Sequence, residues 1–295
     1  MSLPREVIPG RFYMVTRRCT QRQFLLRPDA ATNNAFLYCL ADAAQRCNIT
    51  VLLTCVLSDH HHTIVFDPDG NLPAFTEHFH KLLAKSQNAL RGRWENFWST
   101  EQVCVVRLVD ATDVLNKLVY VATNPVKDRL VAKVHHWPGV NGLTSLLTGR
   151  TLHATRPGHF FRATGPMPAT LTLTLTLPSQ LGDAQQFRAE LRAQVAAVEA
   201  AVEADRLRTG GPVFGRRAIL HQSWRASPTT GEPRGSLRPR LAARSLWSRL
   251  EAIARNREFL AAYRDARAGW LGGAAVVFPG GTYWLRRFAH VPVAT

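Results

Sequence analysis

Residues 49–70 read ITVLLTCVLSDHHHTIVFDPDG, and this stretch decides how the surrounding chain is interpreted. Its first part, 49–57, is a run of β-branched and apolar residues, which is typical of a buried strand. Residues 60–66 predict a second strand that pairs with the first and ends at the turn signal DPDG. We therefore expect two neighbouring strands of one sheet, with three consecutive histidines on the second.

The segments on either side of this pair predict the rest of an α+β fold. The expected strands are 11–16 and 102–108, and the expected helices are 29–47, 72–92 and 112–123, with Asp29 capping the first helix and Asp110 or Thr112 the last. The order of these elements is close to the split βαβ arrangement of ferredoxin-like folds. It predicts an antiparallel central sheet with helices on one face. The pair Asn124-Pro125 is expected to bring the last helix near its end, because proline disfavours the α conformation in the residue before it.

The composition of the chain changes after about residue 145. We expect an α+β domain over 1–145, a connector with a strand at 171–177 over 146–182, and an accessory region of mixed helix and strand over 183–295. Within that accessory region, residues 183–208 and 243–270 predict helices, and 276–288 predict a turn followed by a strand. Tryptophans interleave with arginines there, which indicates a nucleic-acid-binding region, although the tryptophans alone would also suit a small core.

A strong excess of positive charge indicates a polyanionic partner. The 37 basic residues outnumber the 21 acidic ones and give a net charge of +16. Residues 206–295 alone carry 16 arginines and 4 acidic residues, a net charge of +12. Nucleic acid is the first expected partner and an anionic membrane the second, because arginine makes forked contacts to phosphate and stacks on bases. A GC-rich genome would explain the preference for arginine over lysine but not the net charge.

Cysteine usage and apolar patterning favour a cytoplasmic location. The N-terminal stretch MSLPREVIPG has no apolar core of the kind a signal peptide needs, and no run of 18 apolar residues exists. The five cysteines have no metal-site spacing and stand in apolar surroundings, so we expect buried thiols in a reducing compartment. They are Cys19, Cys39, Cys47, Cys55 and Cys104.

The histidine triplet is the first candidate for chemistry. Alternate side chains of a strand share a face, so His60 and His62 are expected to point one way and His61 the other. Two imidazoles on one face can coordinate a divalent cation such as Mn²⁺ or Zn²⁺. Two alternatives remain open. The histidines could be exposed without a ligand, or the strand could slip so that His61 becomes the ligand.

Tyr120, on the helix predicted at 112–123, is the second candidate. A metal that polarises a phosphodiester makes it susceptible to a weak nucleophile such as a phenol. Asn124 follows four residues later on the same helix face, and its amide oxygen is a candidate third metal ligand. The proline after Asn124 leaves the reach of that amide open. The alternative role for Tyr120 is core packing.

Taken together, these motifs resemble those of the REP-associated tyrosine transposases. These are relatives of the single-tyrosine transposases of small bacterial insertion sequences, which belong to the HUH (histidine–hydrophobic–histidine) class. The family pattern is a strand with that histidine motif, then a helix with tyrosine, three residues and Asn-Pro-Val, then Leu-Val and Trp-Pro. The resemblance covers roughly residues 8–145. The matching positions are His60, His62, Tyr120, Asn124-Pro125-Val126, Leu130-Val131 and Trp137-Pro138.

Two positions depart from the family pattern. The middle residue of the motif is usually bulky and apolar, whereas here it is His61. The residue before the motif is often asparagine, whereas here it is Asp59, which could assist the metal or cap the turn.

The resemblance implies a fold, a reaction and a substrate. The fold is an HUH endonuclease core. The metal, expected to be Mg²⁺ or Mn²⁺, is held by His60 and His62 and binds the scissile phosphate of single-stranded DNA. Tyr120 then attacks, a 5′-phosphotyrosine link forms, and a 3′-hydroxyl leaves; the reverse attack gives strand transfer. The resemblance also implies hairpin-containing DNA, with either a monomer or a homodimer as the active species.

Basic residues near these motifs are candidate nucleic-acid contacts, with a solvated basic loop as the alternative. Two rival functions remain: a non-catalytic nucleic-acid-binding module that retains the fold, and a metal-dependent hydrolytic nuclease in which Tyr120 is structural. The candidate contacts are Arg17, Arg18 and Arg22 by the first strand, and Lys127 and Arg129 after the tyrosine helix.

Overall fold

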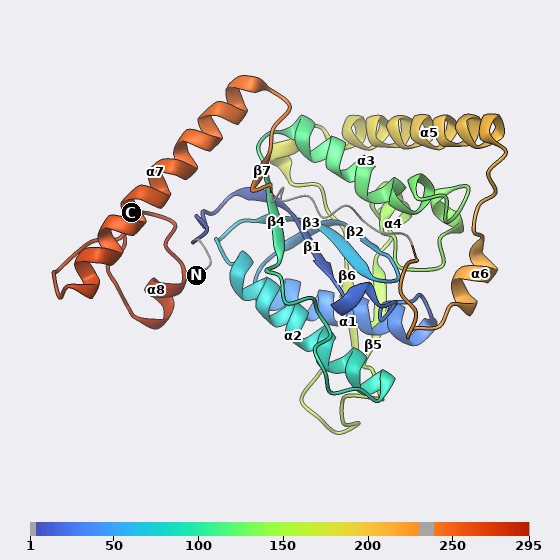
Figure 1. Ribbon diagram of the computed structural model, residues 1–295, viewed down its shortest axis with the longest axis horizontal. Coiled ribbons are helices and arrows are strands. Elements are labelled where there is room, and N and C mark those ends of the chain that lie inside the picture. The colour runs from blue at the N-terminus through green and yellow to red at the C-terminus, as the bar shows by residue number, and fades with distance from the viewer. Residues whose placement is uncertain (1–3, 230–238, 295) are drawn as a thin grey trace.

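A mainly antiparallel five-stranded sheet forms the centre of the molecule. The computed structural model describes residues 4–229 and 239–294. The strands lie in the order β2-β3-β1-β4-β7, and every neighbouring pair is antiparallel except β4 and β7 (Figure 1). Their bounds are β1 Arg11–Arg18, β2 Thr50–Val56, β3 His60–Asp67, β4 Cys104–Leu108 and β7 Leu241–Ala242. The four strands predicted between residues 11 and 108 are therefore confirmed.

Strands β2 and β3 form a tight hairpin that positions the histidine triplet. The Leu57 amide donates to the His60 carbonyl at 2.8 Å and closes the turn. His62 pairs with Cys55 of β2 on one side and with Thr16 of β1 on the other. The triplet therefore lies in the interior of the sheet, where both neighbours hold the register of the strand.

Helices α1 (Ala30–Arg46) and α2 (Leu72–Arg91) cover one face of the sheet and pack against each other (Figure 1). The predicted cap of α1 is confirmed, because a carboxylate oxygen of Asp29 accepts from the Thr32 amide at 2.7 Å. Between these helices and the sheet lie fully buried aromatic rings, including Phe36 of α1 and Phe79 of α2. Burial of such large apolar side chains supplies much of the stability of this layer.

Helix α3 (Ala111–Lys127) covers the opposite face of the sheet, so the expectation of helices on one face only is wrong. The two faces of β3 show this directly. The ring of His61 packs against Phe36 of α1, whereas the ring of His62 packs against Tyr120 of α3. The long helix α5 (Ala184–Thr209) packs on the outside of α3, and this outer cover buries the apolar side of α3 that the sheet leaves free.

Helix α3 also continues through Pro125 rather than ending before it. Its start is as predicted, with Asp110 as the cap in a reciprocal capping box with Asp113. A proline inside a helix removes one backbone hydrogen bond, but here Val126 and the proline are buried, and tertiary packing outweighs that loss. As a result Asn124 has helical geometry and lies one turn after Tyr120.

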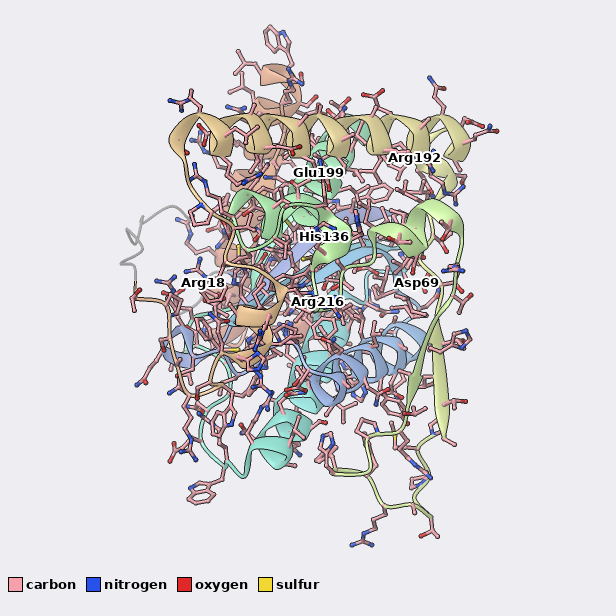
Figure 2. All side chains as sticks on the ribbon, turned by 90° about the vertical axis from the view of Figure 1, so that its right-hand side faces the viewer. Arg18, Asp69, His136, Arg192, Glu199 and Arg216 are labelled. Carbon is pink, nitrogen blue, oxygen red and sulfur yellow. The ribbon has the colours of Figure 1, made fainter. Side chains whose placement is uncertain are left out.

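The connector and the C-terminal region add smaller elements. Helix α5 is tied to the core by Glu199, which accepts from the Val134 amide at 2.7 Å (Figure 2). The first half of the predicted strand 171–177 belongs to β6 and pairs with β5, and beyond it the Thr176 amide donates to the Val51 carbonyl at 3.2 Å. The remaining elements are η1 Thr20–Arg22, η2 Val134–His136, α4 Leu143–Thr148, β5 Leu152–Thr155, β6 Thr170–Leu173, η3 Ser179–Leu181, α6 Arg216–His221, α7 Leu246–Leu271 and α8 Trp284–Phe288.

The strand predicted near the C-terminal end is wrong, because residues after the glycine turn form the short helix α8. Gly281 has φ +87, and an added Cβ would lie 2.8 Å from the Glu6 side chain, so the turn packs tightly on the N-terminal segment. Within α8 the helix satisfies its own backbone groups, whereas Phe278 before the turn forms a parallel bridge with Val293 after the helix.

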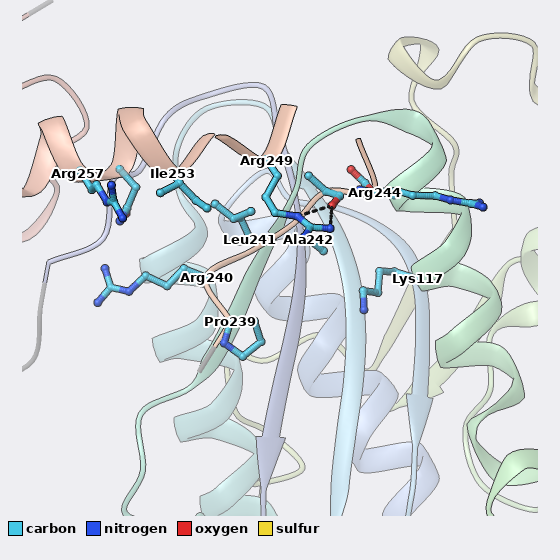
Figure 3. A pocket seen from close by; sticks show the side chains of 12 residues that line it. Lys117, Pro239, Arg240, Leu241, Ala242, Arg244, Arg249, Ile253 and Arg257 are labelled. Atoms are coloured by element: carbon cyan, nitrogen blue, oxygen red, sulfur yellow. Dashed lines mark hydrogen bonds between the residues drawn. The ribbon is translucent and has the colours of Figure 1, made fainter. Parts of the chain in front are cut away.

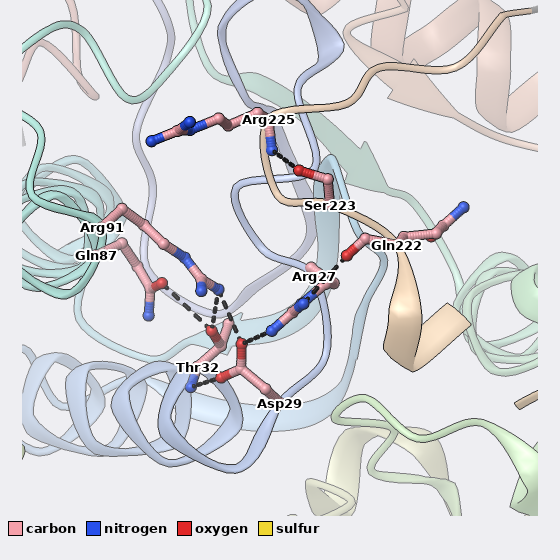
Figure 4. A network of polar contacts seen from close by, with 8 residues as sticks. All are labelled: Arg27, Asp29, Thr32, Gln87, Arg91, Gln222, Ser223 and Arg225. Atoms are coloured by element: carbon pink, nitrogen blue, oxygen red, sulfur yellow. Dashed lines mark hydrogen bonds and ion pairs between the residues drawn. The ribbon is translucent and has the colours of Figure 1, made fainter. Parts of the chain in front are cut away.

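A polar network fastens the segment after α6 to the start of α1. Arg27 donates to the Gln222 carbonyl at 3.1 Å and to the Asp29 carboxylate at 3.0 Å, and Arg91 of α2 donates to the same carboxylate (Figure 4). The predicted division at residue 145 stays a prediction. What the structure shows is that β7 joins the edge of the central sheet and α5 covers α3.

The structure shows how far the cysteines are buried and whether any described helix could cross a membrane. All five cysteines are free thiols, but Cys104 is exposed and Cys47 half-buried, so the expectation that all are buried is wrong for these two. Within the described residues, the structure holds no helix with the length and apolar character that crossing a membrane requires.

Candidate active site

The alternation of β3 separates the histidine triplet into two environments. The rings of His60 and His62 lie on the α3 side with their centres 4.9 Å apart. His61 points into the opposite layer, is fully buried, and lies 3.0 Å from His80 between their Nε2 atoms. Burial lowers the pKa of His61 to about 3, so its imidazole is neutral. The structure therefore places two of the three histidines, and not His61, on the face of Tyr120.

Each histidine of this face is oriented through its Nδ1 atom. The Nδ1 of His62 lies 2.7 Å from Thr16 Oγ1, and the Nδ1 of His60 lies 2.7 Å from Asp59 Oδ1. Burial opposes ionisation of Asp59, but the hydrogen bond to His60 and the nearby cations outweigh it, so the pKa of this carboxyl is lowered. An ionised Asp59 accepts from the Nδ1 of His60, and the neutral imidazole with its proton on Nδ1 carries its lone pair on Nε2. This arrangement is how metal-binding histidines are usually held.

Two buried polar atoms on this face lack a partner among the described residues. They are Nε2 of His62 and Oδ1 of Asn124, in side chains whose residues are 6 % and 7 % exposed. Burial lowers the pKa of His62 well below its ordinary value, so its imidazole is neutral and can donate a lone pair. An unsatisfied buried acceptor costs about 1–3 kcal/mol. Two such acceptors on one face fit a site that binds a cation.

The donor set on this face suits a divalent cation. Two imidazole nitrogens and an amide oxygen are ligands that Mn²⁺, Mg²⁺ and related ions accept in different proportions. Among the described residues, no group of three or more histidine, cysteine, aspartate or glutamate side chains is arranged to hold a metal. The third protein ligand at this site would therefore be the amide of Asn124.

Tyr120 lies beside these donors and between two lysines. Its ring centre is 5.6 Å from that of His62, and the residue is 36 % exposed, so part of its side chain reaches solvent. The amino groups of Lys117 and Lys127 each lie 5.4 Å from the centre of the tyrosine ring. Lys117, Tyr120, Asn124 and Lys127 follow one another at helical spacing on one face of α3. Positive charge here favours binding of a phosphate and development of negative charge on the phenol oxygen.

Three of the five predicted nucleic-acid contacts lie near this face. Arg18 pairs with His60 across the sheet and lies close enough to lower the pKa values of Asp59 and His62. The Nε of Arg22 lies 3.7 Å from the Asp59 carboxylate. Lys127, as described above, lies over Tyr120.

The structure does not bring the other two predicted contacts to this face. Arg17 points to the opposite side of the sheet, where its guanidinium lies 5.5 Å from the centre of the Trp98 ring. Arg129 pairs with Asp205 of α5 at 2.6 Å. Both groups are engaged with the protein itself.

Sequence reasoning missed two residues of the site. Lys117 precedes Tyr120 by three residues, and helical spacing alone could have identified it. Thr16 could not have been found in that way, because its contact with His62 depends on the pairing register of β1 and β3.

Comparison with known proteins identifies no family for this chain. No model of a protein family matches it, and no curated protein matches its sequence. Among solved structures, 48 % of the chain is similar to 82 % of a REP-associated tyrosine transposase bound to a REP hairpin, with 19 % identity and a TM-score of 0.41. In a second solved structure, of a provisionally named transposase from Deinococcus radiodurans R1, 93 % of that chain is similar to 40 % of this one. The identity is 16 % and the TM-score is 0.30. At such TM-scores neither likeness settles fold or function, which have to be inferred from the residues of the site.

Proposed function

We propose that this protein nicks and rejoins single-stranded DNA in a metal-dependent reaction that proceeds through a 5′-phosphotyrosine intermediate. The observation that carries the proposal is the convergence of Tyr120 with two unpartnered buried acceptors, His62 Nε2 and Asn124 Oδ1. A nucleophile next to an incomplete set of metal ligands, on a basic surface, is the arrangement that such a reaction needs. The strand order β2-β3-β1-β4 further supports a ferredoxin-like HUH core.

The residues of the site have two roles, metal binding and nucleophilic attack. His60, His62 and Asn124 would hold Mg²⁺ or Mn²⁺, which when bound would polarise the scissile phosphate. Tyr120 attacks the phosphorus and loses its proton to solvent, so that a bond from phosphorus to the phenol oxygen forms. The bond to the 3′-oxygen breaks, and that oxygen leaves as a 3′-hydroxyl after taking up a proton. Attack by another 3′-hydroxyl reverses these steps and joins two strands.

The lysines and Arg18 contribute by charge. Lys117 and Lys127 lie on the two sides of Tyr120 along α3 and attract the phosphates next to the scissile one. Arg18 lies at the end of β1 beside the metal-binding face. A single chain carries His60, His62, Tyr120 and Asn124 together, which supports an active site that does not need residues from a second copy.

A gel assay under denaturing conditions tests the proposal against its two rivals. Hairpin oligonucleotides from the DNA that flanks the protein's own gene are labelled at the 3′ end and incubated with the protein and Mn²⁺. We expect a labelled protein band in wild type that is absent from Tyr120→Phe and His62→Ala. Cleavage that persists in Tyr120→Phe would support the hydrolytic nuclease instead. Tight binding without cleavage of any hairpin would support the binding module.

A further inference from the structure

A groove next to the candidate active site is formed by parts of the chain that are distant in sequence. It lies between α3, β7 and the start of α7, and its volume is about 740 Å³ (Figure 3). Strand β7 forms one wall and is held in place by backbone contacts. The Arg107 amide donates to the Arg240 carbonyl at 2.9 Å, and the Arg244 amide donates to the Asp113 carboxylate at 2.8 Å. The wall is thus a built part of the fold.

The groove is lined by cations and apolar side chains. Leu241 and Ile253 form part of its apolar surface. Its single acidic residue, Asp113, is already bonded to the backbone of β7. Within residues 4–229 and 239–294, no carboxylate forms an ion pair with any of the lining cations. Those cations are Lys117, Arg240, Arg244, Arg249 and Arg257.

A smaller pocket of about 40 Å³ continues the groove inward and shares Arg240, Leu241 and Asn256 with it. It adds Arg5, Arg11 and Arg107. The only acid in its lining is Glu6, which pairs with Arg11 at 2.6 Å and with Arg255 at 3.0 Å.

Two features of this inner pocket indicate that it is suited to an anion. Burial lowers the pKa of Arg5, and the neighbouring Arg240 lowers it further, which is the signature of like charges held close together. The buried hydroxyl of Tyr13 also lies in the lining, beside the guanidinium of Arg11. A bound anion would reduce the repulsion between the guanidinium groups and could accept from this hydroxyl.

Lys117 connects the groove to the candidate active site. Its side chain lines the groove, and its amino group lies 5.4 Å from the centre of the Tyr120 ring. A polymer that occupies the groove would therefore run up to the nucleophile.

We propose that the groove binds the single-stranded DNA segment that flanks the scissile phosphate, with one backbone phosphate in the inner pocket between Arg5, Arg107 and Arg240. The proposal rests on the proposed function, because it assigns a path to the same substrate. Arginine and lysine contact the phosphates, while bases lie against Leu241 and Ile253. A concave channel with apolar walls suits a flexible single strand better than a flat membrane surface.

The test measures how binding depends on the length of the single strand. Hairpins from the DNA flanking the gene carry single-stranded extensions of increasing length, on the 5′ or the 3′ side, and affinity is measured by fluorescence anisotropy without metal. We compare wild type with Arg244→Gln/Arg257→Gln, which removes two groove cations. The matched control is Arg162→Gln/Arg192→Gln, which removes two exposed arginines outside the groove, one of them on α5 (Figure 2).

We expect an extension on one side to tighten binding by wild type and by the control about tenfold. The groove variant should lose that gain. In the groove variant, the slope of log affinity against log salt concentration should fall in magnitude by about 1.4. Two phosphate contacts are lost, and each contact to a single strand contributes roughly 0.7. Equal dependence on extension length in the groove variant and the control would overturn the proposal, as would a wild type that ignores extensions on both sides. The charge-reversal variant Arg257→Glu is a second test. It should weaken binding of extended hairpins more than Arg244→Gln/Arg257→Gln does.

A parallel adduct assay keeps this proposal separate from the proposed function. On hairpins with the shortest cleavable extension, the groove variant should still form the covalent Tyr120 adduct. If wild type forms no adduct but the groove variant loses the effect of extension length, the groove stands as a DNA-binding site and the strand-transfer function fails. If the adduct forms and extension length has no effect, the function stands and the groove assignment fails.

Discussion

The imidazole of His62 lies edge-on to the ring of Tyr120, with their centres 5.6 Å apart and their planes 71° apart. His62 belongs to β3 of the sheet and Tyr120 to α3, which packs on the face of the sheet opposite α1 and α2 (Figure 1). The contact brings a neutral ring, whose Nε2 has no partner among the described residues, next to a partly exposed tyrosine. Substitutions at and around this contact between His62 and Tyr120 should therefore change the activity in predictable ways.

Replacement of Tyr120 by phenylalanine should abolish the covalent adduct and leave the fold intact. The residue is 36 % exposed, so loss of its hydroxyl should change the free energy of unfolding by no more than about 0.5 kcal/mol. Urea unfolding and a Mn²⁺ titration check that the variant is folded and still binds metal. Strand cleavage at the wild-type rate would show that the phenol is not the nucleophile.

Replacement of Asp59 by asparagine should weaken metal binding about 10- to 100-fold, because the carboxylate holds the Nδ1 of His60 at 2.7 Å and thereby directs Nε2. Isothermal titration with Mn²⁺ measures this effect. The matched control is Asp69→Asn, which removes a carboxylate that bonds to Asn48 at an exposed position. Equal affinities for the two variants would mean that Asp59 only caps the turn.

The buried pair His61 and His80 should make the protein sensitive to acid. Burial lowers the pKa of His61 to about 3 and that of His80 well below its ordinary value, so the unfolded state binds more protons than the folded state below about pH 6.5. Stability is therefore full above that pH and falls as the pH decreases toward 3. For His61 the expected slope is about 1.4 kcal/mol per pH unit.

Urea unfolding at several pH values between 7 and 5 measures this dependence. The double variant His61→Leu/His80→Leu removes both rings together, so that neither is left without its partner across the 3.0 Å contact. We expect a shallower pH dependence in this variant and retention of the tyrosine adduct. An unchanged slope would assign the acid sensitivity to other groups.

Substitutions of the neighbouring β1 residues Arg17 and Arg18 should affect different properties, stability for Arg17 and DNA binding for Arg18. Replacement of Arg18 by glutamine should weaken binding of single-stranded DNA. It should also reduce the magnitude of the slope of log affinity against log salt concentration by roughly 0.7, the contribution of one phosphate contact. Replacement of Arg17 by glutamine should instead lower stability by about 0.5–1 kcal/mol through loss of its contact with Trp98. Anisotropy and urea unfolding distinguish the two effects, and a stronger DNA defect in Arg17→Gln would contradict the assignment of faces.

Local patterns in the sequence predicted much of the structure that lies within single elements. Strand alternation placed His60 and His62 on one face and His61 on the other, as the structure has them. Helical spacing placed Tyr120 and Asn124 on one side of a helix. The strands between residues 11 and 108 and the caps Asp29 and Asp110 follow from signals a few residues long. Prediction was wrong at Pro125, where packing outweighed propensity, and for the strand after the C-terminal glycine turn, where the chain forms α8.

Which of these faces meet depends on contacts between elements that are distant in the sequence. The histidine pair and the tyrosine helix each follow from a local sequence period, but their contact requires α3 to lie on the face of the sheet opposite α1 and α2. Register between β1 and β3 decided that Thr16 holds His62 and that Arg17 turns away. Pairing of β7 with β4 built the groove beside Lys117 from distant parts of the chain. Such long-range contacts depend on the burial of whole surfaces, which no short window of sequence contains.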